Sequence, residues 1–351
     1  MLRFSRCPPV ATVYGIDLGK TYFHVVGTDP TGKPVRRAKL TRNNISEFFA
    51  NVPVATIGME ACPGSQWLAR KLLALGHVVK IIPAQFVKPY VKSNKNDTIN
   101  AAAIAEAVTR PTMRFVPIKH TEQVDLQALH RSRDLIVSSR TRLISQMRAF
   151  CLEYGLPIRI SPAAFKSAIP GILSDDTNDL TPAMRRLLES LWQDFRILDD
   201  RVAAVTAEIA AIANQSDLAR RLVTVPGIGP LTATAIVSAV GAGKQFRTAR
   251  DLAAWLGLTP AQYSTGGKTT LLGISKRGNS YVRRLLIHGA RSCVMHLDRT
   301  RDRLGAWLVG LESRMHANKV VVALANKLAR IAWVILNKPG ALYERSDPRF
   351  A

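Results

Sequence analysis

The chain has 351 residues, with 49 lysines and arginines against 25 aspartates and glutamates, so its formal net charge is +24. This length exceeds one compact core of ordinary size and predicts two or three domains. So large a positive excess repels itself unless a polyanion neutralises it, which makes nucleic acid the expected partner. The sequence contains no cofactor loop, zinc motif or membrane span, which argues against a metabolic enzyme and a transporter.

The cysteines and the apolar segments predict a reduced, cytoplasmic protein that is nucleoid-associated in use and has no membrane partner. Four cysteines lie far apart, without zinc-ligand spacing. The start, MLRFSRCPPV, lacks the continuous apolar core of a signal peptide. The most hydrophobic late segment, Val320 to Leu336, contains Lys327 and Arg330 and is short for a bilayer span, so we predict a buried amphipathic helix.

The N-terminal region alternates strand-like and helix-like segments. Residues 12–18, 22–28 and 35–40 are predicted to form a meander. A helix over 44–50, a strand ending at Glu60, a helix over 66–75, a strand over 77–83 and a short helix follow, and Asp97 opens an alanine-rich helix over 99–109. This alternation predicts a mixed α/β sheet with helices on its faces.

From about Thr121 the β signal disappears. A basic helix is expected first, with its basic stretch from Arg131 to Arg148, and the segment 154–179, with its prolines and glycines, is predicted to be a loop or an insertion. Apolar residues then alternate in steps of four and three, which is a coiled-coil pattern. They are Met184, Leu188, Leu191, Phe195, Leu198, Val202, Val205, Ile209 and Ile212. Two readings remain open, an intramolecular helical hairpin and a homodimer seam.

Past Ser216 the chain is predicted to form short helices punctuated by glycine. Its first landmark is VPGIGPLTATAI at 225–236, in which Gly227 and Gly229 would let backbone N–H groups approach a phosphate. This segment resembles a helix-hairpin-helix clamp on the DNA backbone. A plain tight turn between packed helices is the alternative.

A second landmark is a basic segment from Ser264 to Arg291 that contains no acidic residue. Its basic residues are Lys268, Lys276, Arg277, Arg283, Arg284 and Arg291. Ser264 and Thr265 precede Gly266 and Gly267, a flexible turn that would let a DNA backbone approach a hydroxyl. Such a hydroxyl is either a phosphate-binding donor or a nucleophile, and chemistry alone leaves both open. Lys276, Arg277, Arg283 and Arg284 either hold the backbone or form a solvated helix face.

Three acidic residues of the N-terminal region stand where a ribonuclease-H-like sheet would present them. Asp17 lies in the first strand, Glu60 at the end of a later strand and Asp97 at the start of a helix. An aspartate inside a strand is costly to bury without a partner charge or a metal. Converging carboxylates are what Mg²⁺ requires for phosphodiester chemistry, so these residues are the candidate metal ligands.

Four strings in this order resemble one family over nearly the whole chain. They are YGIDLGK, GMEACPGS, NKNDTINAAAIAEAV and YSTGGKTTLLGISKRGNSYVRRLLIHGAR. They look like the transposases of the insertion-sequence one-ten family, especially its eleven-eleven branch, which is related to the pilin-gene invertases.

The resemblance implies an acidic DEDD site on a RuvC-like fold. The four positions map onto Asp17, Glu60, Asp97 and Asn100, so the fourth carboxylate is missing here. An asparagine oxygen coordinates Mg²⁺ weakly and adds no charge, so a lower metal affinity is expected. The spacing of three places Asn100 on the helix face of Asp97.

The resemblance also implies a serine nucleophile that forms a covalent phosphoserine link to DNA. Ser264 is the chosen nucleophile, with Thr265 as the alternative. The family is known for a guide, or bridge, RNA that pairs with donor and target DNA. The implied partners are DNA, this RNA and further copies of the chain in a homodimer or homotetramer.

The predicted architecture therefore has three parts. Residues 1–118 form a RuvC-like α/β catalytic domain, residues 119–215 form long helices with a coiled coil, and residues 216–351 form a mainly α domain with the serine. The predicted function is a Mg²⁺-dependent DNA transposase. The alternatives are a structure-specific nuclease such as a junction resolvase, in which water attacks, and a non-catalytic nucleic-acid binder, which Asn100 favours.

Overall fold

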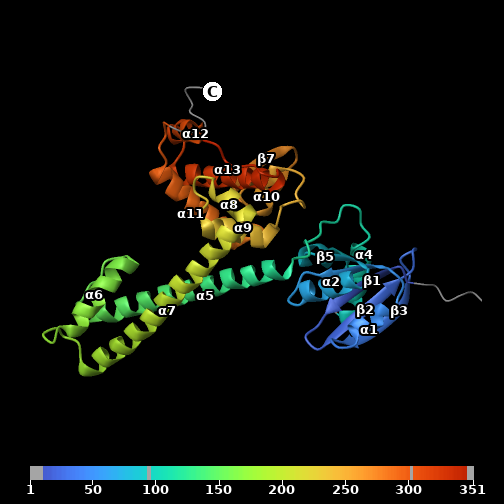
Figure 1. Cartoon of the computed structure of the whole chain (residues 1–351), viewed down its shortest axis with the longest axis horizontal. Coiled ribbons are helices and arrows are strands. Elements are labelled where there is room, and N and C mark those ends of the chain that lie inside the picture. Colours follow the sequence, from blue (N-terminus) through green and yellow to red (C-terminus); the bar gives the residue numbers. More distant parts are fainter. Residues whose placement is uncertain (1–10, 93–95, 301–302, 346–351) are drawn as a thin grey trace, which may run out of the picture. The chain divides into compact units, whose positions relative to one another are not determined.

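The computed structural model describes residues 11–92, 96–300 and 303–345. The chain divides into two compact units, Met1–His120 and Thr121–Ala351. The first is mixed α/β and the second is mostly helical (Figure 1). The further division of the second unit between residues 215 and 216 stays a prediction.

The first unit is built on a five-stranded mixed sheet with the order β3-β2-β1-β4-β5. The strands are β1 (Val13–Leu18), β2 (Tyr22–Thr28), β3 (Pro34–Thr41), β4 (Thr56–Glu60) and β5 (Val78–Ile82). The first three strands form an antiparallel meander, and β4 and β5 extend the sheet in parallel with β1. The predicted meander and the alternation after it are confirmed.

Helices follow or separate the strands of the sheet, and small residues in two strands allow one helix, α4, to approach it closely. They are α1 (Ile45–Ala50), α2 (Ser65–Ala74), α3 (Ala84–Val87) and α4 (Asp97–Ala107), with a 3₁₀ turn η1 (Lys88–Tyr90). A Cβ atom on Gly15 of β1 would lie 2.0 Å from the carbonyl oxygen of Ala101, and one on Gly58 of β4 would lie 2.9 Å from Val108. Glycine at these strand positions therefore sets the close packing of α4 on the sheet.

The second unit begins with a pair of long helices, α5 (Thr121–Glu153) and α7 (Pro182–Gln215), with α6 (Pro162–Ser174) between them. Of the two alternatives for 154–179, a loop or an insertion, the structure has an insertion between the long helices, with α6 in its middle part. The Ser161 hydroxyl accepts a hydrogen bond from the N–H of Ala164, and Pro162 occupies the first turn of α6. A serine N-cap followed by proline is a helix start signal, which the other prolines and glycines obscured.

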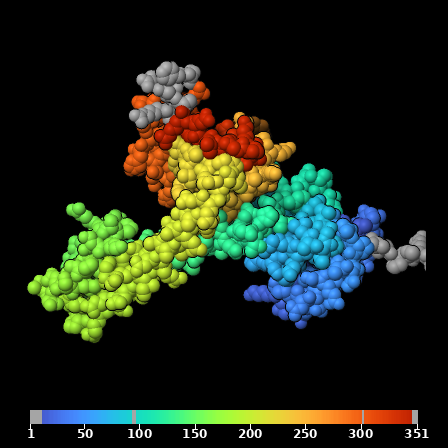
Figure 2. Space-filling view, in the orientation of Figure 1, coloured from blue at the N-terminus to red at the C-terminus, as the bar shows by residue number. Residues whose placement is uncertain are grey.

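The heptad positions of α7 pack within the chain. Leu188 and Phe195 are buried in one core with Phe165 of α6 and Met147 of α5. The space-filling view shows the yellow-green atoms of α6 and α7 as one continuous surface (Figure 2). The intramolecular hairpin is therefore confirmed. The intervening positions of α7, such as Leu191 and Leu198, are half-buried, and the homodimer seam stays a prediction.

The rest of the second unit surrounds its largest core. Its helices are α8 (Asp217–Val223), α9 (Pro230–Val240), α10 (Ala249–Trp255), α11 (Ser280–His296), α12 (Arg303–Glu312) and α13 (Ala317–Asn337). By length and composition α13 could cross a membrane. However, Val320, Leu324 and Leu328 are fully buried in this core, as expected for the predicted amphipathic helix.

Two strands in this helical part were not predicted. β6 (Pro260–Thr265) and β7 (Lys268–Ile274) form an antiparallel hairpin. Gly266 and Gly267 form its turn with φ of 54° and 80°. Two glycines with positive φ between strands are typical of a type I′ turn, which fixes the strand register. The segment expected to be a flexible turn is thus the tip of a β-hairpin.

Candidate functional site

Asp17 and Glu60 lie at the same edge of the sheet. Strands β1 and β4 are parallel neighbours in which Ile16 pairs with Met59, so the next residues along the two strands are Asp17 and Glu60. Both side chains are half-buried. Since parallel strands end at one edge, the sheet itself holds these two acidic residues together.

Helix α4 brings Asn100 close to Asp17 and brings Asp97 close to His24. The Nδ2 of Asn100 donates a hydrogen bond of 3.0 Å to Oδ2 of Asp17. One turn earlier, Oδ2 of Asp97 lies 3.4 Å from Nδ1 of His24. His24 is itself the cross-strand partner of Asp17 in the meander. Asp17, Asp97, Asn100 and His24 therefore form one polar cluster.

The pKa of Cys62 reports the negative charge at this edge of the sheet. Burial raises the pKa of its thiol, and the negative charges of Glu60 and Asp17 raise it further. The thiol therefore stays protonated at neutral pH, and it is a poor nucleophile in this state. The effect also shows that Glu60 and Asp17 both lie near Cys62.

The residue types of the cluster fit a hard divalent cation, since carboxylate and amide oxygens are the ligands that Mg²⁺ prefers. Within the described ranges, however, no three His, Cys, Asp or Glu side chains converge closely enough to hold a metal ion. The amide nitrogen of Asn100 faces the Asp17 carboxylate where a fourth acid was expected. A metal site would require Asp97, whose side chain is 63% exposed, to turn away from His24.

Ser264 lies on the hairpin of the second unit, close to its tip. It pairs across the strands with Thr269, and Thr265 pairs with Lys268. The Ser264 Oγ accepts a hydrogen bond of 2.7 Å from Nε2 of Gln262, which lies on the same strand face. The Ser264 side chain is exposed. No described histidine or carboxylate bonds to it, so a base or an activating group must come from elsewhere.

The predicted basic residues divide into two groups. Arg283 donates hydrogen bonds to the carbonyl oxygens of Leu256 and Arg277, and Arg284 forms an ion pair with Asp134 of α5. The Arg283 guanidinium therefore stabilises the fold, whereas the half-exposed ion pair of Arg284 contributes little. Of the predicted residues that the structure describes, four use no side-chain nitrogen in such a bond: Lys268, Lys276, Arg277 and Arg291.

Lys276 has a backbone conformation unusual for a residue with a side chain, since its φ is 55°. Its N–H bonds to the carbonyl of Gly257, and a Cβ atom on Gly278 would lie 1.7 Å from the carbonyl oxygen of Trp255. Surrounding packing imposes this conformation, and such local strain tends to occur at functional sites. The segment thereby holds Lys276 and Arg277 in place next to the hairpin.

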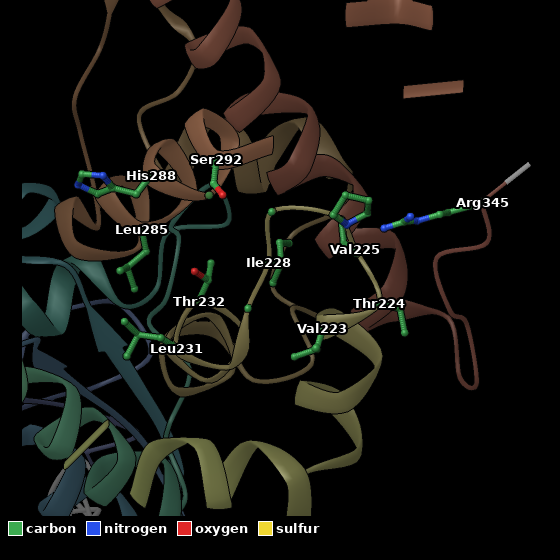
Figure 3. Close-up of a pocket in the computed structure, with 14 residues that line it drawn as sticks. Val223, Thr224, Val225, Ile228, Leu231, Thr232, Leu285, His288, Ser292 and Arg345 are labelled. Atoms are coloured by element: carbon green, nitrogen blue, oxygen red, sulfur yellow. The ribbon is translucent and has the colours of Figure 1, made fainter. Parts of the chain in front are cut away.

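The glycine turn predicted to contact DNA lies between α8 and α9. Gly227 has φ of 82° and packs directly on α11, where a Cβ atom on Gly289 would lie 1.9 Å from the Gly227 carbonyl oxygen. Gly229 caps α9, and a pocket opens beside the turn (Figure 3). Close packing and a positive φ therefore require glycine at 227, whereas a Cβ atom on Gly229 would meet nothing within 4 Å. This finding alone does not distinguish the clamp from the plain turn.

His24 and Gln262 were not predicted from the sequence. The turn between the first two strands sets their register and so places His24 opposite Asp17, which the meander pattern could have revealed. Gln262 stands two residues before Ser264, and only the unrecognised hairpin puts the two side chains on one face.

Two family models and several known proteins are similar to this sequence. Residues 219–304 match the sequence model described as "Transposase IS116/IS110/IS902 family", and residues 14–155 match a model of DEDD transposases of the IS110 type. The chain is 42% identical to the transposase for insertion sequence element IS1328 of Yersinia enterocolitica over 93% of its length and 97% of that protein. It is 40% identical to the transposase for insertion sequence element IS1111A of Coxiella burnetii over 93% of its length and 90% of that protein.

Proposed function

Because the chain belongs to the IS116/IS110/IS902 family of transposases and is thus a DNA transposase, we propose that its acidic cluster and Ser264 act on one phosphodiester of DNA. The observation that supports this most directly is the gathering of Asp17, Asp97 and Asn100 from a strand and a helix far apart in sequence. We further propose that the first unit has the RuvC-like fold, since it combines an antiparallel meander with parallel strands and an acidic edge.

In this proposal Asp17, Glu60 and Asp97 hold Mg²⁺, with Asn100 as a weak fourth ligand. When bound, the ion supplies a Lewis acid that offsets negative charge on the phosphate. The carboxylates of the sheet edge fix its position, and the amide of Asn100 must rotate to offer its oxygen. An amide contributes no charge, which predicts weaker metal binding than four carboxylates provide.

Ser264 is proposed as the nucleophile, with Thr265 as the alternative. A bond forms between Oγ of Ser264 and phosphorus, the bond from phosphorus to one sugar oxygen breaks, and that oxygen takes up a proton. A hydroxyl of a second DNA end then attacks phosphorus and releases the serine. The hairpin favours this role because it exposes Ser264 and keeps Gln262 hydrogen-bonded to its oxygen.

Nucleic acid contacts are proposed at Gly227, Gly229, Gly266, Gly267, Lys268, Lys276 and Arg277. Arg283 and Arg284, which were also predicted to contact nucleic acid, are left out because their guanidinium groups bond within the chain. A guide RNA is proposed as a further partner, as is a homodimer or homotetramer in the cytoplasm. On α5, Arg133, Arg140 and Arg148 bond to Thr206, Asp199 and the carbonyl of Ile158 within the chain. Contacts with RNA on this helix would therefore involve its exposed Arg131 and Arg142.

The test combines two substitutions in the full chain. Asn100→Asp removes the donor to Asp17 and adds the missing carboxylate, so it should raise Mg²⁺ affinity in calorimetry and increase strand cleavage. The DNA substrate is a nicked duplex with the sequence that flanks the coding sequence. RNA transcribed from the same flanking sequence is added to the assay. Covalent protein–DNA adducts that survive detergent should form with Asn100→Asp and vanish with Asn100→Asp/Ser264→Ala.

Thr265→Ala is the matched control, because it removes the neighbouring hydroxyl and should leave the adduct intact. Efficient hydrolysis without an adduct would favour the structure-specific nuclease. No gain in Mg²⁺-dependent cleavage with Asn100→Asp would favour the non-catalytic binder.

A further inference from the structure

A pocket with a volume of ≈ 570 Å³ lies between the turn at Val225–Gly229 and helix α11. The first residues of α9 form one wall, Leu285 and Ser292 of α11 form another, and Arg345 approaches from a third direction (Figure 3). None of the 14 residues that line it is acidic. An anion entering this pocket would therefore meet no opposing negative side chain.

The turn presents several backbone donors without acceptors. In the part of the chain that the structure describes, the N–H groups of Gly227, Gly229, Leu231 and Thr232 donate no hydrogen bond. The last two belong to the first turn of α9, a helix of 11 residues, whose N-terminal N–H groups and dipole favour negative charge. The residues of all four groups line the pocket.

Thr232 provides an independent indication of a ligand. Its side chain lines the pocket although the residue is only 7% exposed. Among the described residues its hydroxyl has no hydrogen-bond partner, whereas the hydroxyl of Thr234 donates to the carbonyl of Pro230 in the usual way for a helix. Since Arg140 Nε is the one fully enclosed side-chain polar atom without a partner among the described residues, the Thr232 hydroxyl reaches solvent through the pocket and is available to a ligand.

We propose that this pocket binds one phosphate of a nucleic acid backbone. The N–H groups of Gly229, Leu231 and Thr232 donate to its oxygens, together with the hydroxyls of Thr232 and Ser292. The guanidinium of Arg345 offsets its charge. This inference rests on the proposed nucleic acid contacts of the second unit, and it adds side chains from α9, α11 and the segment after α13.

The test measures binding of the full chain to a random-sequence duplex by fluorescence anisotropy. Thr232→Val keeps the shape of the side chain and removes the hydroxyl, and Ser292→Ala removes the second hydroxyl. The double variant should raise Kd about tenfold, because hydrogen bonds to a charged group are lost. Arg345→Gln should also reduce the salt slope by about one. Ser313→Ala, which removes an exposed hydroxyl at the end of α12, should bind like the wild type.

A second measurement separates the phosphate of a backbone from free phosphate. Titration with inorganic phosphate should shift the amide NMR signals of Gly229 and Leu231 in the wild type and less in Thr232→Val. Signals that stay unchanged with both phosphate and duplex would overturn the proposal. Binding of inorganic phosphate with no change in the duplex Kd of any variant would also overturn it, because the site would then serve free phosphate.

Failure of this inference is distinguishable from failure of the proposed function. If Lys276→Gln and Arg277→Gln weaken duplex binding while the pocket variants do not, the wider interface remains and the phosphate pocket is refuted. Equal melting temperatures of wild type and variants show that no variant acts by unfolding.

Discussion

His130 shows at the scale of one residue how packing alters chemistry. It is 2% exposed in the second unit, and its ring nitrogens lie 3.1 Å from the hydroxyl of Tyr281 and 3.0 Å from that of Thr234. Burial, with a smaller effect from the charge of Arg133, lowers its pKa from 6.5 to about 4. The neutral imidazole thus joins α5, α9 and α11 by hydrogen bonds.

This environment predicts that the second unit loses stability in mild acid. The unfolded imidazole takes up a proton near pH 6.5 and the folded one only near 4, so the unfolded state binds more protons between these values. Stability should be full above this window, decrease by about 2 kcal/mol by pH 5, and level off below pH 4. Urea unfolding of wild type and His130→Gln at several pH values measures the difference.

The control is His296→Gln, which replaces an exposed histidine at the end of α11. It should keep the pH dependence of the wild type. An equally steep loss of stability between pH 7 and 5 in His130→Gln would contradict the assignment to His130.

At the scale of elements, the packing of α4 on the sheet decides whether the acidic cluster exists. Helix α4 contains both Asp97 and Asn100. Its face toward the sheet includes Ala101 and Ala105, which contact Gly15. Side chains larger than these would push the helix away from β1. The distance between Asn100 and Asp17 therefore depends on a glycine two residues before the acid.

Gly15→Ala is expected to destabilise the first unit by about 1–3 kcal/mol, because the new methyl group overlaps the Ala101 carbonyl. It should also weaken Mg²⁺ binding, since α4 must shift. Thermal unfolding and metal titration measure both effects. In contrast, Gly171→Ala in α6 meets nothing within 4 Å and should stabilise by about 0.5–1 kcal/mol. Similar effects of the two substitutions would contradict this account.

The hairpin of β6 and β7 was harder to predict from the sequence than the buried elements. Its strands bury little surface, and most of their side chains are exposed. The hydrophobic pattern that predicts most strands is therefore absent, and only the Gly266–Gly267 turn with flanking threonines indicated it. Secondary structure was easiest to predict where one face of an element is buried, as in β1, β4 and α7.

At the scale of the whole molecule, a charge of +24 predicts strong and salt-dependent binding of nucleic acid. Charge alone does not identify which side chains touch phosphate. The Arg283 guanidinium donates to two backbone carbonyls, whereas the side chains of Lys276 and Arg277 are available to a ligand. Neighbouring cations therefore differ in role.

Lys276→Gln and Arg277→Gln should each reduce the slope of log K against log salt by about one, without loss of stability. Arg283→Gln should lower the melting temperature instead, because the carbonyls of Leu256 and Arg277 lose their donor. Duplex binding over a salt series and thermal unfolding distinguish the two classes. A large change of salt slope in Arg283→Gln at unchanged stability would contradict this division.

The sequence by itself determined the α/β character of the first unit, the long helices and the acidic positions, because periodic burial and chain order are local properties. It also identified the family through four separate motifs. Only tertiary structure decided that Asn100 donates to Asp17, that His24 meets Asp97, that Arg283 stabilises the fold and that Thr232 stays unpaired in a pocket. These contacts join residues distant in sequence, and the packing of whole elements fixes their geometry.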